Sequence, residues 1–278
     1  MAPWQFLLVV AAVSFGAGTF GALLGLGGGV ILVPALTLLL GIDIRYAIGA
    51  SIVSVIATSS GAAATYVRDG ITNMRIGMFL EMGTTLGAVS GAFLANLISG
   101  RVLFLIFAGV LAYSGYVMFL KRNQDLPAKV QSDALARRLG LEGSYYDAAL
   151  GQTVYYGVTN TSPVLGLSYV AGVVSGLLGI GGGPLQVPAM DILMKLPIKV
   201  SSATSSFMIG VTAAASAAVY FMRGQINPLI AAPVALGVLG GARVGTHLMI
   251  HARSRMLRLI FAALLAVLAV QMLAKGLF

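Results

Sequence analysis

Residues 25–36 read GLGGGVILVPAL, and residues 179–190 read GIGGGPLQVPAM, nearly the same phrase a second time. In both copies, glycines and a proline interrupt an apolar run. Inside a helix, a glycine costs about 1 kcal/mol relative to alanine and a proline about 3 kcal/mol. A pattern this unfavourable, present twice, predicts a helix break at the same place in two related parts of the chain.

The two phrases belong to a longer internal repeat. Shifting the sequence by 154 residues aligns it with itself without a gap over about 95 positions. A constant offset that matches glycines and polar residues together indicates duplication, because biased composition alone would let the offset drift. The matched pairs include Pro34 with Pro188, Ser51 with Ser205, Thr58 with Thr212, Tyr66 with Tyr220, Asn73 with Asn227, and Gly83, Gly87 and Gly91 with Gly237, Gly241 and Gly245.

The composition excludes an ordinary soluble domain. Hydrophobic residues make up 58% of the chain and charged residues 9%, with a mean hydropathy of +0.96, whereas a soluble domain has about 25% charged residues. We assign the net charge of +9 to cytoplasmic loops and an anionic membrane face, and expect no nucleic-acid partner. The absence of cysteine excludes disulfides, thiolate metal sites and cysteine nucleophiles.

The hydrophobic segments follow from helix length, since about 20 apolar residues are needed to cross a bilayer. Residues 1–3 lack the basic region of a signal peptide, so the first segment is predicted to be a retained helix. A linker, residues 121–161, contains VQSDALARRLG, which predicts a short amphipathic helix. The N-terminal repeat, residues 4–120, contains the predicted segments 4–24, 25–41, 46–67, 76–99 and 102–120, and the C-terminal repeat, residues 162–278, contains 162–178, 179–194, 199–222, 228–248 and 257–276.

The distribution of lysine and arginine predicts the topology. If the glycine segments cross the bilayer, twelve basic residues lie on one face and four on the other; if they dip in and return, the counts are nine and seven. Cytoplasmic loops are enriched in these residues, which favours five crossings per repeat, an outside N-terminus and a cytoplasmic linker. The twelve are Arg68, Arg75, Lys121, Arg122, Lys129, Arg137, Arg138, Lys195, Lys199, Arg253, Arg255 and Arg258, against Arg45, Arg101, Arg223 and Lys275.

The predicted fold is an all-α polytopic membrane protein with two inverted-topology repeats, whose short Gly/Pro-broken helices meet at a central site. An odd number of crossings per repeat inverts one repeat relative to the other, although each glycine segment could also be a broken pair of short helices. Broken segments at matching positions of inverted repeats are typical of secondary transporters and mark their substrate site.

The consecutive glycines suit an anion. They let backbone N–H groups converge on one point, and a helix that restarts near Val30 or Pro184 would add its positive end. Close helix packing is the alternative, and we prefer it for the glycines spaced four apart, such as Gly83, Gly87 and Gly91. The predicted substrate-binding glycines are Gly27, Gly28, Gly29, Gly181, Gly182 and Gly183.

Together with the serine-rich stretches that follow them, ASIVSVIATSSGA and ATSSFMIGVTAAA, the two phrases resemble the sulfite exporter TauE/SafE family. The resemblance covers both repeats and leaves out the 121–161 linker. It implies a multi-pass carrier of the bacterial inner (cytoplasmic) membrane, from a family associated with export of sulfite and small organosulfonates such as sulfoacetate. Members differ in substrate, so the resemblance implies the class of protein more firmly than the ligand.

Polar side chains within the segments are further candidates. The hydroxyls of Ser51 and Ser205 can donate to sulfite or sulfonate oxygens, or equally to a neighbouring backbone carbonyl. For Ser54, Thr58, Thr204 and Thr212 we prefer the backbone alternative. Gln186 is predicted to line the cavity, and Asn73 and Asn227 are predicted to cap helices or form turns.

Charge inside a membrane segment is costly and usually functional. Arg243 is predicted to bind the substrate through its fork of donors, with pairing to Asp191 or snorkelling to the basic face as alternatives. Glu81 and Asp191 are candidates for proton coupling, although Glu81 lies near enough to a helix end to reach the interface. None of the three recurs in the other repeat.

The leading functional hypothesis is a secondary carrier that exports a small sulfur-containing anion by alternating access. No Walker sequence is present, and the membrane potential favours anion exit by about 2.3 kcal/mol per charge per 100 mV, so uniport would suffice. The alternatives are an anion-selective, channel-like pore or a carrier for a different small anion.

An enzyme is not expected, because His247 and His251 have no nucleophile–base pair or metal-ligand set beside them. We expect no cofactor and no metal. The expected partners are a small anionic substrate and the lipid bilayer, and the oligomeric state is left open, with a homodimer among the alternatives. A purely structural membrane subunit would show no ligand-dependent stability.

Overall fold

The computed structural model describes residues 3–120 and 130–277, and it is helical apart from one β-hairpin. An all-α membrane protein was predicted, and the fold class is confirmed. The first half contains α1 (Pro3–Leu24), α2 (Gly29–Leu39), α3 (Ile44–Arg68), α4 (Met74–Leu94), a short 3-10 turn (Ala95–Leu97) and α5 (Gly100–Leu120). The second half contains α7 (Thr161–Leu178), α8 (Gly183–Pro188), a π-helical turn (Ala189–Leu193), α9 (Ile198–Met222), α10 (Pro228–His251) and α11 (Ser254–Leu277).

Eight of the described helices, α1, α3, α4, α5, α7, α9, α10 and α11, are long and apolar enough to cross a membrane. The helices of the glycine segments are not. Helix α2 has 11 residues, which at about 1.5 Å per residue reach roughly 17 Å of the roughly 30 Å hydrocarbon core. The prediction that each glycine segment crosses as one helix is therefore wrong.

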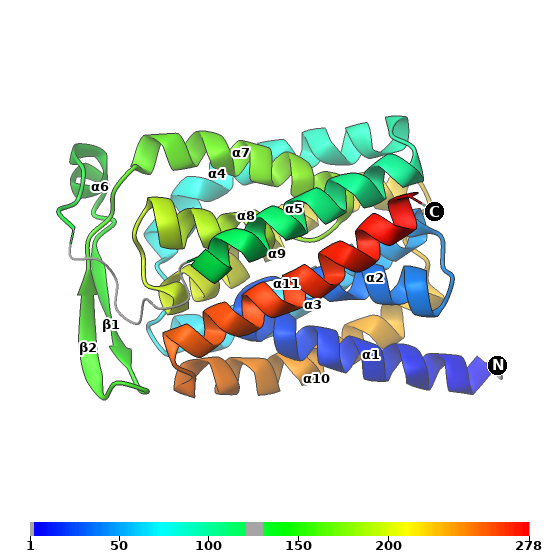
Figure 1. Ribbon diagram of the computed structural model, residues 1–278, viewed down its shortest axis with the longest axis horizontal. Helices are drawn as coiled ribbons and strands as arrows, with labels where there is room; N and C mark the ends of the chain where they lie inside the picture. The colour runs from blue at the N-terminus through cyan, green and yellow to red at the C-terminus, as the bar shows by residue number, and fades with distance from the viewer. Residues whose placement is uncertain (1–2, 121–129, 278) are drawn as a thin grey trace.

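Each broken segment turns the chain back instead. In Figure 1, α1 begins at the end of the molecule that carries both termini, and α2 leads back to that end; α7 and α8 do the same from the end that carries the linker. Such a pair returns the chain to its starting side, as two crossings would, so the partition of basic residues stays a prediction that this arrangement does not contradict. Arg101 and Lys275 indeed line one cavity beside Asp43. Lys121, Arg122 and Lys129 lie outside the described residues.

The two halves are interleaved by close helix packing. Helix α4 packs on α7, and α10 packs on α1, while α3 packs on α9 and α5 on α11. The packing interpretation of the spaced glycines is confirmed, because a side chain on any of them would run into backbone of the facing helix. Gly83, Gly87 and Gly91 face Leu165, Tyr169 and Val173, and Gly237, Gly241 and Gly245 face Ala11, Phe15 and Thr19, which are the same contacts displaced by 154 residues.

Replacement of Gly87 or Gly241 by alanine should lower stability by about 1–3 kcal/mol, because the new β-carbon meets the carbonyl of Tyr169 or Phe15. Thermal unfolding of the detergent-purified protein measures the effect. Gly109→Ala is the matched control, since nothing lies within 4 Å of its position. Equal stability of Gly87→Ala, Gly241→Ala and Gly109→Ala would show that the interfaces of α4 with α7 and of α10 with α1 have room for the added methyl group.

The linker holds a helix and a hairpin. The predicted amphipathic helix is confirmed as α6 (Ala134–Leu139), whose first turn is capped by the Asp133 carboxylate. The hairpin of β1 (Gly143–Asp147) and β2 (Gln152–Tyr156) was not predicted. Its signal lay in the β-branched and aromatic residues of SYYD and TVYY, which are enriched in strands.

A buried ion pair ties this hairpin to the membrane helices. The Lys199 ammonium at the start of α9 donates to the Asp147 carboxylate at 2.8 Å and to the carbonyl of Ile250 at 3.0 Å. Tyr145 donates to the same carboxylate at 2.9 Å, and 1% and 2% of the Lys199 and Asp147 side chains are exposed. Burial alone would raise the pKa of Asp147, but Lys199 and Tyr145 hold it below its ordinary range.

Asp147→Asn should destabilise the protein by about 3 kcal/mol or more near neutral pH, because it leaves the Lys199 charge buried and unpaired. Since the folded pKa is lowered, the contribution of Asp147 is present above its unfolded pKa of about 3.9 and is lost as the pH falls through the lower folded value. Thermal unfolding should therefore show the variant and the natural protein converging below about pH 4.

Asp69→Asn is the control for that experiment. Its partner Arg68 is 3.4 Å away, and 78% and 29% of the Arg68 and Asp69 side chains are exposed. Exposed pairs contribute about 0–1 kcal/mol to stability. A loss of stability in Asp69→Asn as large as that in Asp147→Asn would contradict the larger contribution expected of the buried pair.

Candidate functional site

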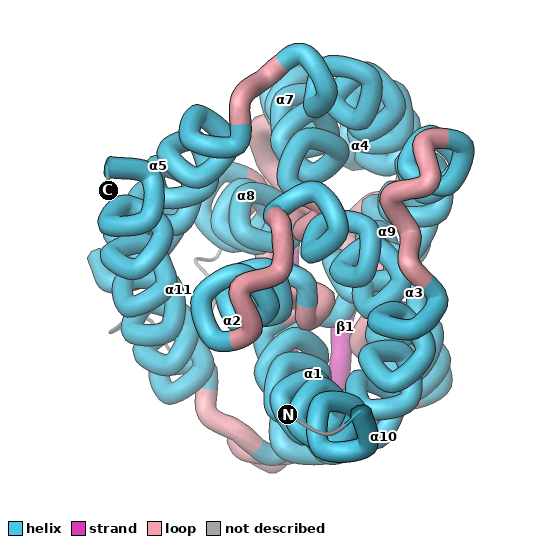
Figure 2. Tube along the Cα trace, turned by 90° about the vertical axis from the view of Figure 1, so that its right-hand side faces the viewer, coloured by secondary structure: helices cyan, strands magenta, loops and turns pink. Residues whose placement is uncertain are grey.

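Two buried glycine loops lie between the short helices and the long ones. The first loop, residues 25–28, joins α1 to α2, and the second loop, residues 179–182, joins α7 to α8. Figure 2 shows α2 and α8 inside the ring formed by the long helices. Three glycines in each loop have positive φ, a backbone conformation that ends a helix and that other residues adopt at a cost. They are Gly25, Gly27 and Gly28, and their equivalents Gly179, Gly181 and Gly182.

The two loops are held against each other by a crosswise pair of hydrogen bonds. Ser51 of the first half donates to the carbonyl of Gly179 at 2.6 Å, and Ser205 of the second half donates to the carbonyl of Gly25 at 2.8 Å. A β-carbon at Gly29 would lie 2.9 Å from the Gly179 carbonyl oxygen, so the loops leave no room for a side chain. Both serines thus take the backbone alternative, and a direct role in substrate binding stays a prediction.

Tyrosines brace each loop from within its own half. The hydroxyl of Tyr66 donates to the carbonyl of Ala22 at 2.9 Å, and Tyr220 donates to the carbonyl of Gly176 at 2.7 Å. These carbonyls belong to the last turns of α1 and α7, which have no continuing helix to accept from. The two bonds are equivalent, displaced by 154 residues, and Tyr220 also donates to the carbonyl of Leu177 at 3.3 Å.

The polar side chains beside the loops do not follow the repeat. A β-carbon at Gly28 would lie 3.0 Å from the Ser54 hydroxyl and 3.2 Å from that of Thr58. One at Gly182 would lie 3.3 Å from the amide nitrogen of Gln186. The equivalents of Ser54 and Gln186 are Met208 and Leu32, so each loop has its own polar neighbours.

Several of these polar atoms are buried and have no hydrogen-bond partner in the part of the chain that the structure describes. They are the hydroxyl oxygen of Ser54 and both amide atoms of Gln186, whose residues are 0% and 2% exposed. An unpaired buried polar group costs about 1–3 kcal/mol. That cost is understandable where a ligand supplies the missing partner. Thr58, by contrast, donates to the carbonyl of Ser54 in its own helix, as predicted. The same prediction is wrong for Ser54, whose hydroxyl has no partner among the described residues, and for Thr212, which donates to Glu81.

The loops also meet two apolar side chains. Val55 on α3 and its equivalent Ile209 on α9 both contact the β-positions of Gly27 and Gly181. Sequence reasoning missed this pair, because Val and Ile in a membrane segment carry no signal of their own. They place a small apolar wall between backbone groups of the two loops, so polar contacts at the centre come from Gly28, Gly182 and their neighbours.

The N-terminus of α2 is an uncapped positive end. Gly28 is its N-cap, and no side chain bonds the first turn. Amide groups and the helix dipole there favour negative charge. At α8, Pro184 removes one of the amide donors that the first turn would otherwise present. The centre is therefore richer in donors on the side of Gly28.

The three charged candidates are placed differently from one another. Asp191 is paired with Arg258, which donates from Nε at 3.1 Å and from Nη2 at 2.6 Å, and both side chains are buried. The considered pairing of Asp191 with Arg243 is therefore wrong. Arg243 lies on an exposed face of α10, whereas the loops are buried. The structure thus does not bring Arg243 to the loops, and its role in binding stays a prediction.

Glu81 on α4 is 8% exposed, so its side chain lies inside the protein. Its Oε1 accepts from Thr85 at 2.8 Å and from Thr212 at 2.7 Å, and its Oε2 has no hydrogen-bond partner. Asn73 and Asn227 cap α4 and α10 through their side-chain oxygens, which confirms that prediction.

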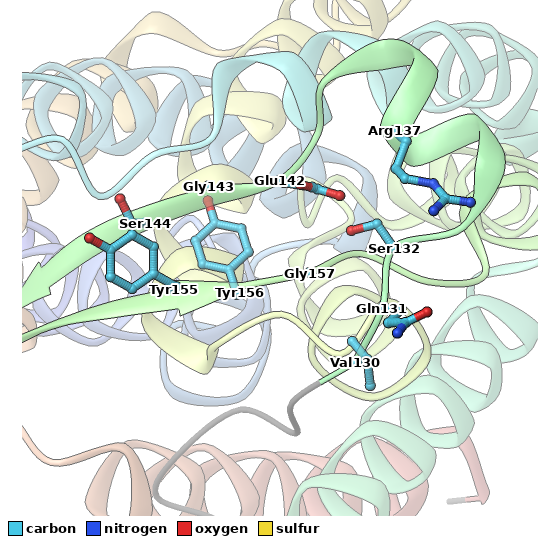
Figure 3. A pocket seen from close by; sticks show the side chains of 10 residues that line it. All are labelled: Val130, Gln131, Ser132, Arg137, Glu142, Gly143, Ser144, Tyr155, Tyr156 and Gly157. Carbon is cyan, nitrogen blue, oxygen red and sulfur yellow. The ribbon is translucent and has the colours of Figure 1, made fainter.

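A hollow of about 690 Å³ in the linker is separate from this centre. Figure 3 shows Ser132, Arg137 and Glu142 among the residues around it. All of its lining residues lie between positions 130 and 157, so no glycine-loop residue contributes. It is a feature of the linker and not of the repeated helices.

Loss of the crosswise serine bonds should loosen the loops. Ser51→Ala and Ser205→Ala should each cost about 1 kcal/mol, because each leaves a buried loop carbonyl unpaired. Thermal unfolding measures the loss, and Ser60→Ala, whose exposed hydroxyl bonds its own helix, should cost nothing measurable. Unchanged stability together with a lost response to anions would instead support direct substrate binding by the two serines.

Comparisons with known proteins agree with this architecture. Residues 10–272 match the family model described as "Sulfite exporter TauE/SafE". The chain is 28% identical over 269 residues to "Probable membrane transporter protein YunE" of Bacillus subtilis (strain 168), covering 94% of this chain and 95% of that protein. It is 29% identical over 238 residues to "Probable membrane transporter protein YdhB" of the same organism, covering 86% and 88%. No solved structure matches the chain significantly.

Proposed function

The chain belongs to the sulfite exporter TauE/SafE family, and from that premise we propose that it is a secondary carrier that exports a small sulfur-containing anion. Its class is that of a multi-pass membrane transporter, by its eight apolar helices and its relatives. Within that class, the proposal names sulfite or an organosulfonate such as sulfoacetate as substrate. It places the protein in the bacterial inner membrane, with the basic linker face in the cytoplasm.

The observation that carries the proposal is the unpaired polar set at the glycine loops. Ser54 supplies a hydroxyl and Gln186 an amide, and neither has a partner among the described residues. Both lie beside loop glycines, with the uncapped N-terminus of α2 next to Ser54. Sulfite and sulfonate oxygens accept hydrogen bonds from such donors, and backbone dipoles attract the charge without a fixed cation. Binding by dipoles alone suits a carrier, since its ligand must also leave.

Alternating access is supported by the doubled contacts. The serine and tyrosine bonds that hold the first loop have equivalents that hold the second, so two arrangements of the centre can have similar energies with the halves exchanging roles. In an inverted repeat, one arrangement would open the centre to each side of the membrane. The membrane potential then drives an anion outward by about 2.3 kcal/mol per charge per 100 mV.

Two alternatives remain, an anion-selective pore and a carrier for a different small anion. The paired loops favour a carrier, because the side chains of Val55 and Ile209 both lie against Gly27 and Gly181 at the centre. Saturation of anion flux into proteoliposomes at low concentration would support a carrier, whereas flux proportional to concentration would support a pore. No catalytic function and no nucleic-acid partner is proposed, and a homodimer is one candidate assembly.

Thermal unfolding in sulfite, sulfoacetate, taurine, sulfate, thiosulfate and acetate tests the substrate class. A specific sulfur anion at about 100 times its Kd should add about 2.7 kcal/mol of stability. Ser54→Ala, Gln186→Leu and Gly28→Ala should each lose this response. Gln186→Leu is an informative variant, because the equivalent position of the other half already carries a leucine, Leu32.

Ser14→Ala is the matched control for Ser54→Ala. Its hydroxyl is also buried and unpaired, but Ser14 packs against Gly237 in the seam of α1 and α10. The control should keep the response of the natural protein. No response to any of the six anions, or a response that survives all three site variants, would count against an anion site at the loops.

A further inference from the structure

Glu81 is a buried acid that has no cation beside it. In the part of the chain that the structure describes, its carboxylate accepts from two threonine hydroxyls and from no lysine or arginine. The other oxygen, Oε2, has no hydrogen-bond partner within residues 3–120 and 130–277. An isolated carboxylate in a membrane interior is strongly disfavoured unless it is paired or neutralised. A positive charge from outside the protein is therefore needed to neutralise the Glu81 carboxylate.

The charged and titratable groups on the elements packed against Glu81 are engaged elsewhere. Helix α4 packs on α7 and α9. Their other ionisable side chains bond to carbonyls, to a hydroxyl or to Asp147, and none bonds to Glu81. They are Arg75 to Gly140, Tyr169 to Ser90, Lys199 to Asp147, Tyr220 to Gly176, and Arg223 to Ala92.

Asp191, the other buried acid of the membrane helices, is already neutralised. Its two oxygens accept from the two nitrogens of the Arg258 fork. A proton arriving there would have to displace a bidentate pair, which is among the strongest hydrogen-bonded arrangements in proteins. Of the two candidates for coupling, the structure therefore leaves Glu81 available and engages Asp191.

Glu81 is connected to the glycine loops through α9. Its partner Thr212 lies three residues after Ile209 on the same helix face, and Ile209 contacts Gly27 and Gly181 of the two loops. Thr212 is also the equivalent of Thr58, whose hydroxyl lies beside Gly28. An anion held at the loops and an ionised Glu81 would therefore repel each other across a low-dielectric interior.

From this arrangement we infer that Glu81 is a proton-binding site linked to the anion site, so that each anion binds together with one proton. The inference rests on the proposed function and specifies its coupling. A proton from the cytoplasmic water neutralises the Glu81 carboxylate, the anion occupies the loops, and both are released on the far side. The negative charge moved per cycle is then smaller by one than that of the anion.

Linkage gives this coupling a measurable form. Anion affinity should be constant while Glu81 is protonated and should fall about tenfold per pH unit once it ionises. Calorimetric titration of the purified protein with sulfoacetate, in two buffers of different ionisation enthalpy, counts the protons taken up. We expect about one proton per anion in the falling range. Sulfite serves as a second probe once the protonation of the free ion is subtracted.

Glu81→Gln imitates the protonated acid. It should bind sulfoacetate with a pH-independent affinity and take up no proton, whereas Glu142→Gln, the same change on an exposed linker residue, should behave as the natural protein. Thr212→Val is a second variant, which removes a donor to the ionised carboxylate. It should move the fall in affinity to higher pH, because the proton is then held more tightly.

The possible outcomes distinguish a failure of the proton-coupling inference from a failure of the proposed function. Anion binding without proton uptake, or uptake that persists in Glu81→Gln, would overturn the inference and leave the carrier standing. Affinity that depends on sodium in place of pH would overturn it as well, since the site would then take a metal cation. If neither sulfite nor sulfoacetate binds, the proposed function fails and this inference fails with it.

Discussion

A backbone group inside a membrane must find a hydrogen-bond partner within the protein, and the centre of this molecule is organised by that requirement. One loop separates α1 from α2 and the other separates α7 from α8, inside the membrane, where water is not available to the loop carbonyls. The carbonyls of Gly25 and Gly179 are satisfied by serines from the opposite half, and those of Ala22 and Gly176 by tyrosines from their own half. The loops can therefore exist only where both halves are assembled around them.

The residues proposed to bind the anion and the proton lie at positions where the two halves differ. Residues that build the centre recur at the 154-residue offset, whereas Ser54 faces Met208 in the alignment, Gln186 faces Leu32, and Glu81 faces Ala235. A scaffold that is nearly symmetric, carrying polar groups that are not, can keep two arrangements close in energy while binding a ligand on unequal terms. The internal repeat thus distinguishes the recurring residues of the scaffold from the polar residues that occur in one half alone.

Much of the fold could be read from the sequence, because hydropathy and helix length constrain membrane helices strongly. The repeat also predicted the seams at Gly87 and Gly241, and the asparagine caps. The partners of buried charge could not be read, since Asp191 and Arg258 are 67 residues apart and only folding brings them together. Nor did the sequence show that each glycine loop joins two helices that turn the chain back together, since such a pair leaves the same charge pattern as two crossings. The serines were ambiguous because a hydroxyl serves backbone and ligand alike.

The exchange of helices between halves also has a consequence for synthesis of the chain. Helix α1 packs on α10, and about 200 residues separate the end of one from the start of the other. At about 5–20 residues per second, α1 waits roughly 10 to 40 s for its partner to be made. Its glycine-facing surface is therefore exposed to lipid or to the insertion machinery during that time. The N-terminal half therefore cannot complete its packing before the C-terminal half is made, and the protein folds late in its translation.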